Sequence, residues 1–171
     1  IEGSFKFRGK EFPYANTPCE RAVEIPLAKY FIDHHRPVIE VGAVTPYWYD
    51  GENIQLETRN PAPTCNVPWR VVDPTDQYPF CERSRAIDVD YRGAFVLSIS
   101  TLEHIGLGEY AGDRGDTQEA IDTLLKITSQ AAEYFITWPS GYNYDLDNFT
   151  KDSGLPVYMI EQKPYLHFFE L

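Results

Sequence analysis

The sequence predicts an α/β fold with a mostly parallel sheet, and three observations support this prediction. The apolar runs Pro37–Val44 and Gly93–Ser100 show no alternation, which is typical of strands covered on both faces. An amphipathic segment at Asp116–Ala132 is typical of a surface helix. Strands that alternate with helices along a chain favour parallel pairing with right-handed crossovers.

The sequence of the N-terminal region predicts an arm followed by a helix. Residues 1–16 place four aromatic residues among basic residues and glycines, so we expect an irregular arm. Thr17–Glu20 has the hydroxyl, proline and glutamate of a capping box, which predicts a helix beginning at Thr17. Pro26 is expected to kink this helix, and His34 and His35 are expected at its end, where cations suit the helix dipole.

The remaining elements follow from apolar runs and turn residues. The segment 140–154 predicts turns and a short helix after the amphipathic segment. The predicted strands are Pro37–Val44, Trp69–Asp73, Ala86–Tyr91, Gly93–Ser100 and Glu133–Pro139, followed by two within Pro156–Leu171 that pair as an antiparallel hairpin.

Length and charge limit the classes of function. A chain of 171 residues fits one domain, with the arm and capping helix in residues 1–36 and the sheet-containing core in 37–171. The net charge of −11 disfavours a nucleic-acid partner, and no apolar run is long enough to span a membrane. The chain shows no signal-peptide plan, and its three cysteines have no C-x-x-C spacing, so we expect a reduced, cytoplasmic protein without a metal site. No pattern indicates an oligomeric state.

Three of the predicted strands in turn end near an acid. These acids are Glu40, Asp73 and Asp88, and the carboxyl ends of parallel strands share one edge of a sheet. Gly42 allows backbone to approach a ligand, and an acid after the second strand can accept hydrogen bonds from both ribose hydroxyls. An acid after the third strand would lie near an adenine. The pattern therefore predicts an adenosine cofactor, although Glu40 alone is equally well explained by a structural ion pair with Arg21 or Arg36.

Several motifs resemble those of class I S-adenosylmethionine-dependent methyltransferases. More closely, the chain resembles a set of small members of that superfamily in the segments VIEVGAV, WRVVDPTD, IDVDYR and especially FVLSISTLEHIGLGEY, and also in NTPCERAVEIPLA and ITWPSGYN. The resemblance implies one Rossmann-like methyltransferase domain with a mostly parallel seven-stranded sheet, a C-terminal antiparallel hairpin and helices on both faces. The glycine-rich loop of the superfamily is reduced here to Gly42.

The resemblance also implies a cofactor site for S-adenosylmethionine. It assigns the methionine moiety to Glu40, Gly42 and Ala43, and the ribose to Asp73. It assigns the adenine to Asp88 and Val89. Ser98, Ile99 and Ser100 would flank the sulfonium.

His104 is the candidate catalytic residue. A histidine after a strand end can act as a general base toward an acceptor hydroxyl, because its usual pKa lies near neutrality. The alternative is a histidine that orients the loop by bonding to backbone. Glu103 and His104 are too few ligands for a metal site, so none is predicted. Tyr14, Trp48 and Tyr49 are candidates for an acceptor wall, or for ordinary loop packing.

Together these observations predict a methyltransferase that acts on a small-molecule acceptor, such as a sugar or metabolite hydroxyl. One alternative is a methyltransferase-like module that binds without turnover, which the reduced glycine loop favours. A nicotinamide-dependent oxidoreductase is less favoured, because GAVTPY lacks the further glycines of G-x-G-x-x-G.

Overall fold

A four-stranded parallel sheet forms the centre of the molecule. The computed structural model describes residues 3–35, 37–49, 69–78, 81–110, 113 and 115–157. In this part of the chain the strand order is β4-β3-β5-β6, and a separate two-stranded antiparallel sheet pairs β1 with β2. The elements in chain order are β1 (Ser4–Phe7), β2 (Lys10–Pro13), α1 (Arg21–His34), β3 (Val38–Val41), α2 (Pro46–Tyr49), β4 (Trp69–Val72), the 3-10 helix η2 (Ala86–Asp88), β5 (Phe95–Ile99), the 3-10 helix η3 (Leu102–His104), α4 (Gln118–Gln130), β6 (Glu133–Thr137) and α5 (Tyr144–Asp152).

The strand order contains a topological switch point. From β3 the chain passes to β4 on one side, and it then returns to place β5 on the other side of β3. All three pairings within this sheet are parallel, so the carboxyl ends of the strands lie at one edge. Open α/β sheets bind ligands in the crevice where connections diverge in this way, which here is the edge at β3 and β5.

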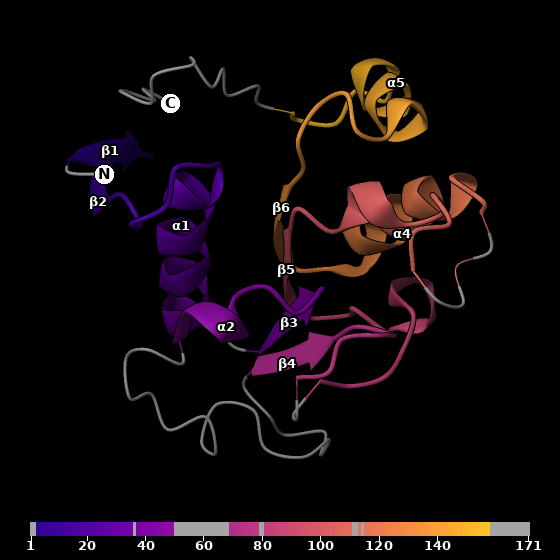
Figure 1. Ribbon diagram of the computed structural model, residues 1–171, viewed down its shortest axis with the longest axis horizontal. Coiled ribbons are helices and arrows are strands. Elements are labelled where there is room, and N and C mark those ends of the chain that lie inside the picture. Colours follow the sequence, from indigo (N-terminus) through magenta and orange to yellow (C-terminus); the bar gives the residue numbers. More distant parts are fainter. Residues whose placement is uncertain are drawn as a thin grey trace.

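Helices cover both faces of the sheet, as the sequence predicts. In Figure 1, α1 and α4 lie on opposite sides of β5 and β6. The core is correspondingly divided into two clusters, one with Leu27 and Phe31 of α1 and the other with Leu124 and Ile127 of α4. Alternate residues of each central strand enter the two clusters because side chains alternate across a sheet.

The predicted seven-stranded Rossmann-like sheet is wrong for the described part of the chain, which contains four parallel strands. Ala86–Tyr91 was expected as a strand, but it forms η2 followed by an irregular segment. Ala86, Val89 and Tyr91 are all buried in one cluster, and their spacing suits a 3-10 turn better than strand alternation. The Tyr91 hydroxyl closes this turn by donating to the Ala86 carbonyl over 2.7 Å.

The N-terminal region also differs from its prediction. The expected irregular arm contains the β1–β2 hairpin, in which the stacked rings of Phe5 and Phe12 are buried against the α1 side of the core. The helix begins at Arg21 rather than Thr17, because the Thr17 hydroxyl contacts the Cys19 thiol instead of capping a backbone amide. The predicted C-terminal hairpin lies largely outside the described residues, as it would occupy 156–171.

The other predicted elements are confirmed with small changes at their ends. The runs expected as strands around residues 40, 71, 97 and 135 form β3, β4, β5 and β6. The amphipathic segment forms α4, and the short helix expected within 140–154 is α5. At the end of α1, His34 lies with its Nδ1 2.7 Å from the Tyr30 carbonyl oxygen, in agreement with its predicted place at the helix terminus. No helix of the described residues has the length and apolar character needed to cross a membrane.

Candidate functional site

Glu40 lies in the middle of β3 and is fully buried on the α1 face of the sheet. Its Oε1 accepts hydrogen bonds from the amides of Val44 at 3.3 Å and Thr45 at 2.7 Å, and its Oε2 accepts one from the Trp69 indole at 3.2 Å. Burial raises the pKa of Glu40 to about 7, although these hydrogen bonds oppose the rise. Glu40 therefore holds the turn that follows β3 through these contacts. Of its two expected ion-pair partners, Arg21 pairs with Glu24 instead and Arg36 lies outside the described residues.

Gly42 is required for the turn at the end of β3. Its φ is +86°, and its amide donates to the Val72 carbonyl over 2.9 Å. A Cβ at this position would lie 2.1 Å from the Thr101 Oγ1 atom. The space beside Gly42 is thus filled by Thr101, which lies two residues after the end of β5, and the neighbouring Ala43 is buried. This close contact joins the carboxyl ends of the two strands at the switch point.

Asp73 follows β4 and organises the loop after it. Its Oδ1 accepts hydrogen bonds from the amides of Thr75 and Asp76, both at 2.8 Å, and from the Thr75 hydroxyl at 3.2 Å. No described residue donates a hydrogen bond to its Oδ2. One oxygen of this half-buried carboxylate therefore builds the turn, while the other accepts no hydrogen bond from the described residues.

The structure does not bring Asp88 into contact with Glu40 or Asp73. Asp88 is exposed at the end of η2, whose packing partner is α4. The same turn is held to α4 by Lys126, whose Nζ donates to the Ile87 carbonyl over 2.7 Å. Val89 is buried in the α4 cluster.

The end of β5 combines buried hydroxyls with an uncommon backbone conformation. Ser98 and Ile99 are fully buried, and the Ser98 hydroxyl has no hydrogen-bond partner among the described residues. Ser100 has a φ of +39°, which is a strained conformation for a residue with a side chain. Its hydroxyl donates to the buried Glu24 of α1 over 3.0 Å, and Arg21 pairs with the other oxygen of that carboxylate at 2.5 Å.

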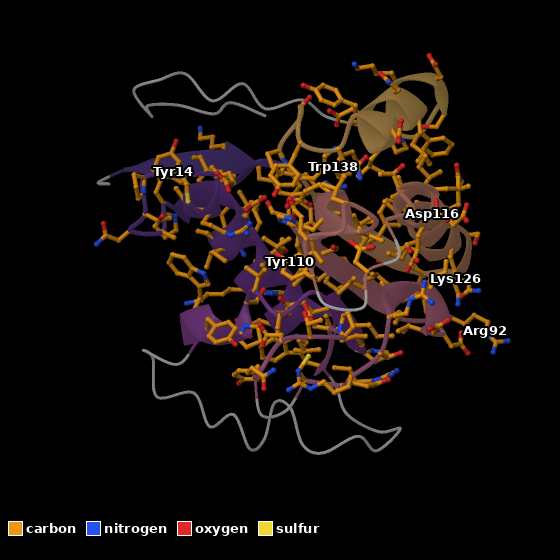
Figure 2. All side chains as sticks on the ribbon, turned by 45° about the vertical axis from the view of Figure 1, so that its right-hand side comes forward. Tyr14, Arg92, Tyr110, Asp116, Lys126 and Trp138 are labelled. Carbon is orange, nitrogen blue, oxygen red and sulfur yellow. The ribbon has the colours of Figure 1, made fainter. Side chains whose placement is uncertain are left out.

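Four polar side chains, two of them from η3 itself, gather at the end of η3. The Nδ1 atom of His104 lies 2.7 Å from Oε2 of Glu109, and Oε1 of Glu109 accepts a hydrogen bond from the Tyr142 hydroxyl at 2.8 Å. The His104 ring also makes edge contacts with the rings of Tyr142 and Tyr110. In Figure 2, Tyr110 lies over the middle of the molecule, whereas Arg92 and Lys126 extend from its outer edge. We name Glu103, His104, Glu109 and Tyr142 the His104 cluster.

Glu103 is the buried member of the His104 cluster, with only 1% of its side chain exposed. Its Oε1 lies 3.7 Å from Nε2 of His104, and its Oε2 has no hydrogen-bond partner in the described part of the chain. Burial, together with the nearby negative charge of Glu24, raises the pKa of Glu103 to about 8. Glu103 is therefore largely a neutral acid at pH 7, which makes its burial tolerable.

Asn143 fixes the position of the His104 cluster. This buried residue is the N-cap of α5, where its Oδ1 accepts from the Leu146 amide at 3.1 Å. Its Nδ2 donates to the backbone carbonyl of Glu103 over 3.2 Å. The segment before it is held by Asp147, which accepts hydrogen bonds from the Trp138 indole and the Gly141 amide. One side chain thus connects η3, α5 and the loop that carries Tyr142.

Sequence patterns identified His104 but missed most of its partners. Glu109 and Tyr142 are separated by 33 residues, so no local spacing connects them. The asparagine before the apolar and acidic residues of α5 was a usable N-cap signal for Asn143. For the buried acids Glu24 and Glu103, no feature of the sequence indicated that they approach one another.

Metal-ligand groups and surface hollows in the described part of the chain do not extend the candidate site at the carboxyl edge of the sheet. Within the described residues, no group of three or more histidine, cysteine, aspartate or glutamate side chains is arranged to hold a metal ion. Two surface hollows lie elsewhere, one of about 320 Å³ at α5 beside Phe149 and one of about 170 Å³ between the β1–β2 hairpin and α1, beside Lys10 and Tyr30. No protein-family model, curated protein or solved structure matches this chain.

Proposed function

We propose that this chain is an S-adenosylmethionine-dependent methyltransferase that acts on a hydroxyl group of a small-molecule acceptor. The supporting observation is the switch point at the carboxyl ends of β3 and β5, where Gly42 and Ser100 end their strands and the His104 cluster follows. Open α/β sheets use this position for ligands. The motif resemblance supplies the identity of the cofactor, and the free thiols of Cys19 and Cys81 support a reducing, cytoplasmic location.

The donor and acceptor groups at this edge fit part of the proposed cofactor. The Oδ2 atom of Asp73 suits a ribose hydroxyl, because a carboxylate oxygen accepts such hydrogen bonds strongly. The unpaired hydroxyl of Ser98, with Ile99 and Ser100 beside it, is proposed to flank the sulfonium. Asp88 and Val89 are proposed for the adenine.

Glu40, Gly42 and Ala43 are proposed to support the methionine moiety by shaping the turn after β3. Glu40 already accepts three internal hydrogen bonds, so its contribution is to hold the amides of Val44 and Thr45 in place. Gly42 allows the turn to pass against Thr101. In this proposal the turn contacts the cofactor through its backbone rather than through open side chains.

When bound, S-adenosylmethionine supplies an activated methyl group, so the protein has to align the acceptor and remove one proton. His104 is proposed to take that proton. It follows the end of β5 and lies half-buried, with its Nε2 atom directed to the side of Glu103. A histidine suits this task because it accepts and releases protons near neutral pH.

Calorimetric titration with S-adenosylhomocysteine tests the cofactor site, and Asp73→Asn is the sharpest variant. Asparagine keeps the Oδ1 acceptor of the turn but replaces Oδ2 with a donor, so we expect binding to weaken by about 10-fold to 100-fold. The matched control is Asp76→Asn, which changes a neighbouring acid that contacts Tyr47 and Tyr78 instead. Absence of binding by the unmodified protein at about 1 mM ligand would overturn the proposal.

A non-catalytic binding module is the second candidate. It is favoured by the complete internal pairing of Glu40 and by the contact between Gly42 and Thr101, which leave little of the turn for a ligand. The methyltransferase and the binding module differ in whether a methyl group is transferred to an acceptor. A protein that binds S-adenosylhomocysteine but transfers no labelled methyl group to a panel of hydroxyl, amine and thiol acceptors would support the module.

A further inference from the structure

Glu109 holds two proton donors from distant parts of the chain. Its Oε2 lies 2.7 Å from Nδ1 of His104, and its Oε1 accepts the Tyr142 hydroxyl hydrogen at 2.8 Å. The ring of His104 also lies against the ring of Tyr142, with centroids 4.7 Å apart and an interplanar angle of 66°. The imidazole is therefore held by a carboxylate at one nitrogen and by an aromatic edge contact.

The charges in this arrangement decide where the proton of His104 lies. The hydrogen bond from His104 holds the pKa of Glu109 below its usual range, so Glu109 is an anion near neutral pH. The bond to Glu109 raises the pKa of Tyr142, so the phenol keeps its hydrogen and remains a donor. A carboxylate can only accept hydrogen bonds, and Nδ1 of His104 must then carry the hydrogen.

When the ring of His104 is neutral, a hydrogen on Nδ1 leaves a lone pair on the other ring nitrogen, Nε2. The polar atom that the structure places near Nε2 is Oε1 of Glu103, at 3.7 Å. That separation exceeds the usual length of an N–H···O or O–H···N hydrogen bond, so no close contact within the described part of the chain uses the lone pair. Glu103 is itself buried, and its Oε2 atom has no hydrogen-bond partner among the residues that the structure describes.

We propose that Glu109 and Tyr142 are positioning residues that fix His104 in the Nδ1-protonated tautomer, so that Nε2 accepts the proton of the acceptor hydroxyl. The inference rests on the proposed function for the identity of the acceptor. In this step the O–H bond of the acceptor breaks, its electron pair stays on the oxygen, and an N–H bond forms at Nε2. The carboxylate of Glu109 stabilises the resulting imidazolium.

The loop that carries Tyr142 is anchored by Asn143. Asn143 ties the carbonyl of Glu103 to the first turn of α5, immediately after Tyr142 in the chain. Removing the phenol hydroxyl or the carboxylate leaves Asn143 and its contacts in place. Variants of Glu109 and Tyr142 therefore test orientation of His104 separately from folding of the loop.

Nitrogen NMR of the histidine rings tests the tautomer without reference to activity. The signals of His104 are assigned with His104→Gln, and the neutral ring in the unmodified protein is expected to carry its hydrogen on Nδ1. Glu109→Ala should shift the population toward protonation at Nε2, and Tyr142→Phe should produce a smaller shift in the same direction. The matched control is Tyr144→Phe, which removes a hydroxyl from an exposed tyrosine two residues away.

The kinetic readout separates this inference from the proposed function. With a methyl acceptor in hand, Glu109→Ala should lower kcat by about 10-fold to 100-fold while the affinity for S-adenosylhomocysteine stays unchanged. An unchanged tautomer in Glu109→Ala would overturn the positioning role even in an active enzyme. A shifted tautomer in a protein that binds no S-adenosylhomocysteine would sustain the positioning role and overturn the methyltransferase.

Discussion

The Trp69 indole donates a hydrogen bond to Oε2 of Glu40 over 3.2 Å, and this bond joins two adjacent strands inside the core. Trp69 pairs in register with Val38, two residues before Glu40, so both side chains lie on the α1 face of the sheet. Both side chains are almost completely buried. A carboxylate within an apolar core is tolerated here because each of its oxygens accepts at least one hydrogen bond.

Trp69→Phe should destabilise the protein by about 2–4 kcal/mol, because it removes the donor to a buried carboxylate as well as some buried surface. The measurement is urea unfolding at pH 7.5. Trp138→Phe is the matched control, since that half-buried indole donates to Asp147, which retains its bond from the Gly141 amide. We expect a clearly smaller loss there, and equal losses would contradict the special role of the Glu40 contact.

Glu103 should make the protein less stable as the pH rises. Its pKa is about 8 in the folded state against an ordinary value of 4.5, so the acid is protonated in both states below pH 4.5 and carries no penalty there. Between pH 4.5 and 8 the unfolded chain loses the proton first, which favours unfolding by up to roughly 3–5 kcal/mol. Glu40, with a pKa of about 7, contributes in the same direction over a narrower range.

Glu103→Gln removes this penalty, so its stability relative to the unmodified protein should increase between pH 5.5 and 8.5. Urea unfolding at several pH values in this range gives the slope. Glu133→Gln serves as the control because Glu133 is exposed at the start of β6 and should leave the slope unchanged. A parallel pH dependence for Glu103→Gln and the unmodified protein would show that Glu103 does not titrate as described.

Gly42→Ala should destabilise the protein by roughly 2–4 kcal/mol, because alanine is strained at a φ of +86° and its Cβ would meet Thr101. The double variant with Thr101→Ala removes the obstacle but not the backbone strain. It should therefore recover part of the loss, measured as the coupling energy of a double-mutant cycle. Strict additivity of the two single changes would mean that the two residues do not collide.

Asn143→Ala should cost about 1–2 kcal/mol, because it removes the cap of α5 and the bond to the Glu103 carbonyl. The control is Thr117→Ala at the N-cap of α4, whose side chain makes no capping hydrogen bond and donates instead to the exposed Asp145. We expect the control to lose less than about 0.5 kcal/mol. In proton NMR, Asn143→Ala should also change the ring-current shifts of His104, because Tyr142 precedes the lost cap. Unchanged shifts would show that the cap of α5 does not position the His104 cluster.

The sequence by itself determined the parallel α/β core. Runs such as Val38–Val41 and Phe95–Ile99 are apolar on both faces, and such strands are stable only between two layers of helices. The same local logic identified α4, placed Glu40 in a buried strand and placed His104 just beyond the end of another. These features depend on periodicity and burial, which neighbouring residues in the chain express.

Only the tertiary structure decided how the polar groups are paired. Glu40 meets Trp69, 29 residues away, and Glu24 meets Ser100, 76 residues away, so their partners are set by strand order and helix docking rather than by spacing. The same applies to Glu109 and Tyr142, which reach one another because β6 returns the chain to the edge where β5 ends. The prediction of seven strands was wrong for a related reason. Packing against α4 determines which side of Ala86–Tyr91 is buried, and this segment is not a strand. Local patterns specify which residues are buried, whereas packing specifies what each buried polar group contacts.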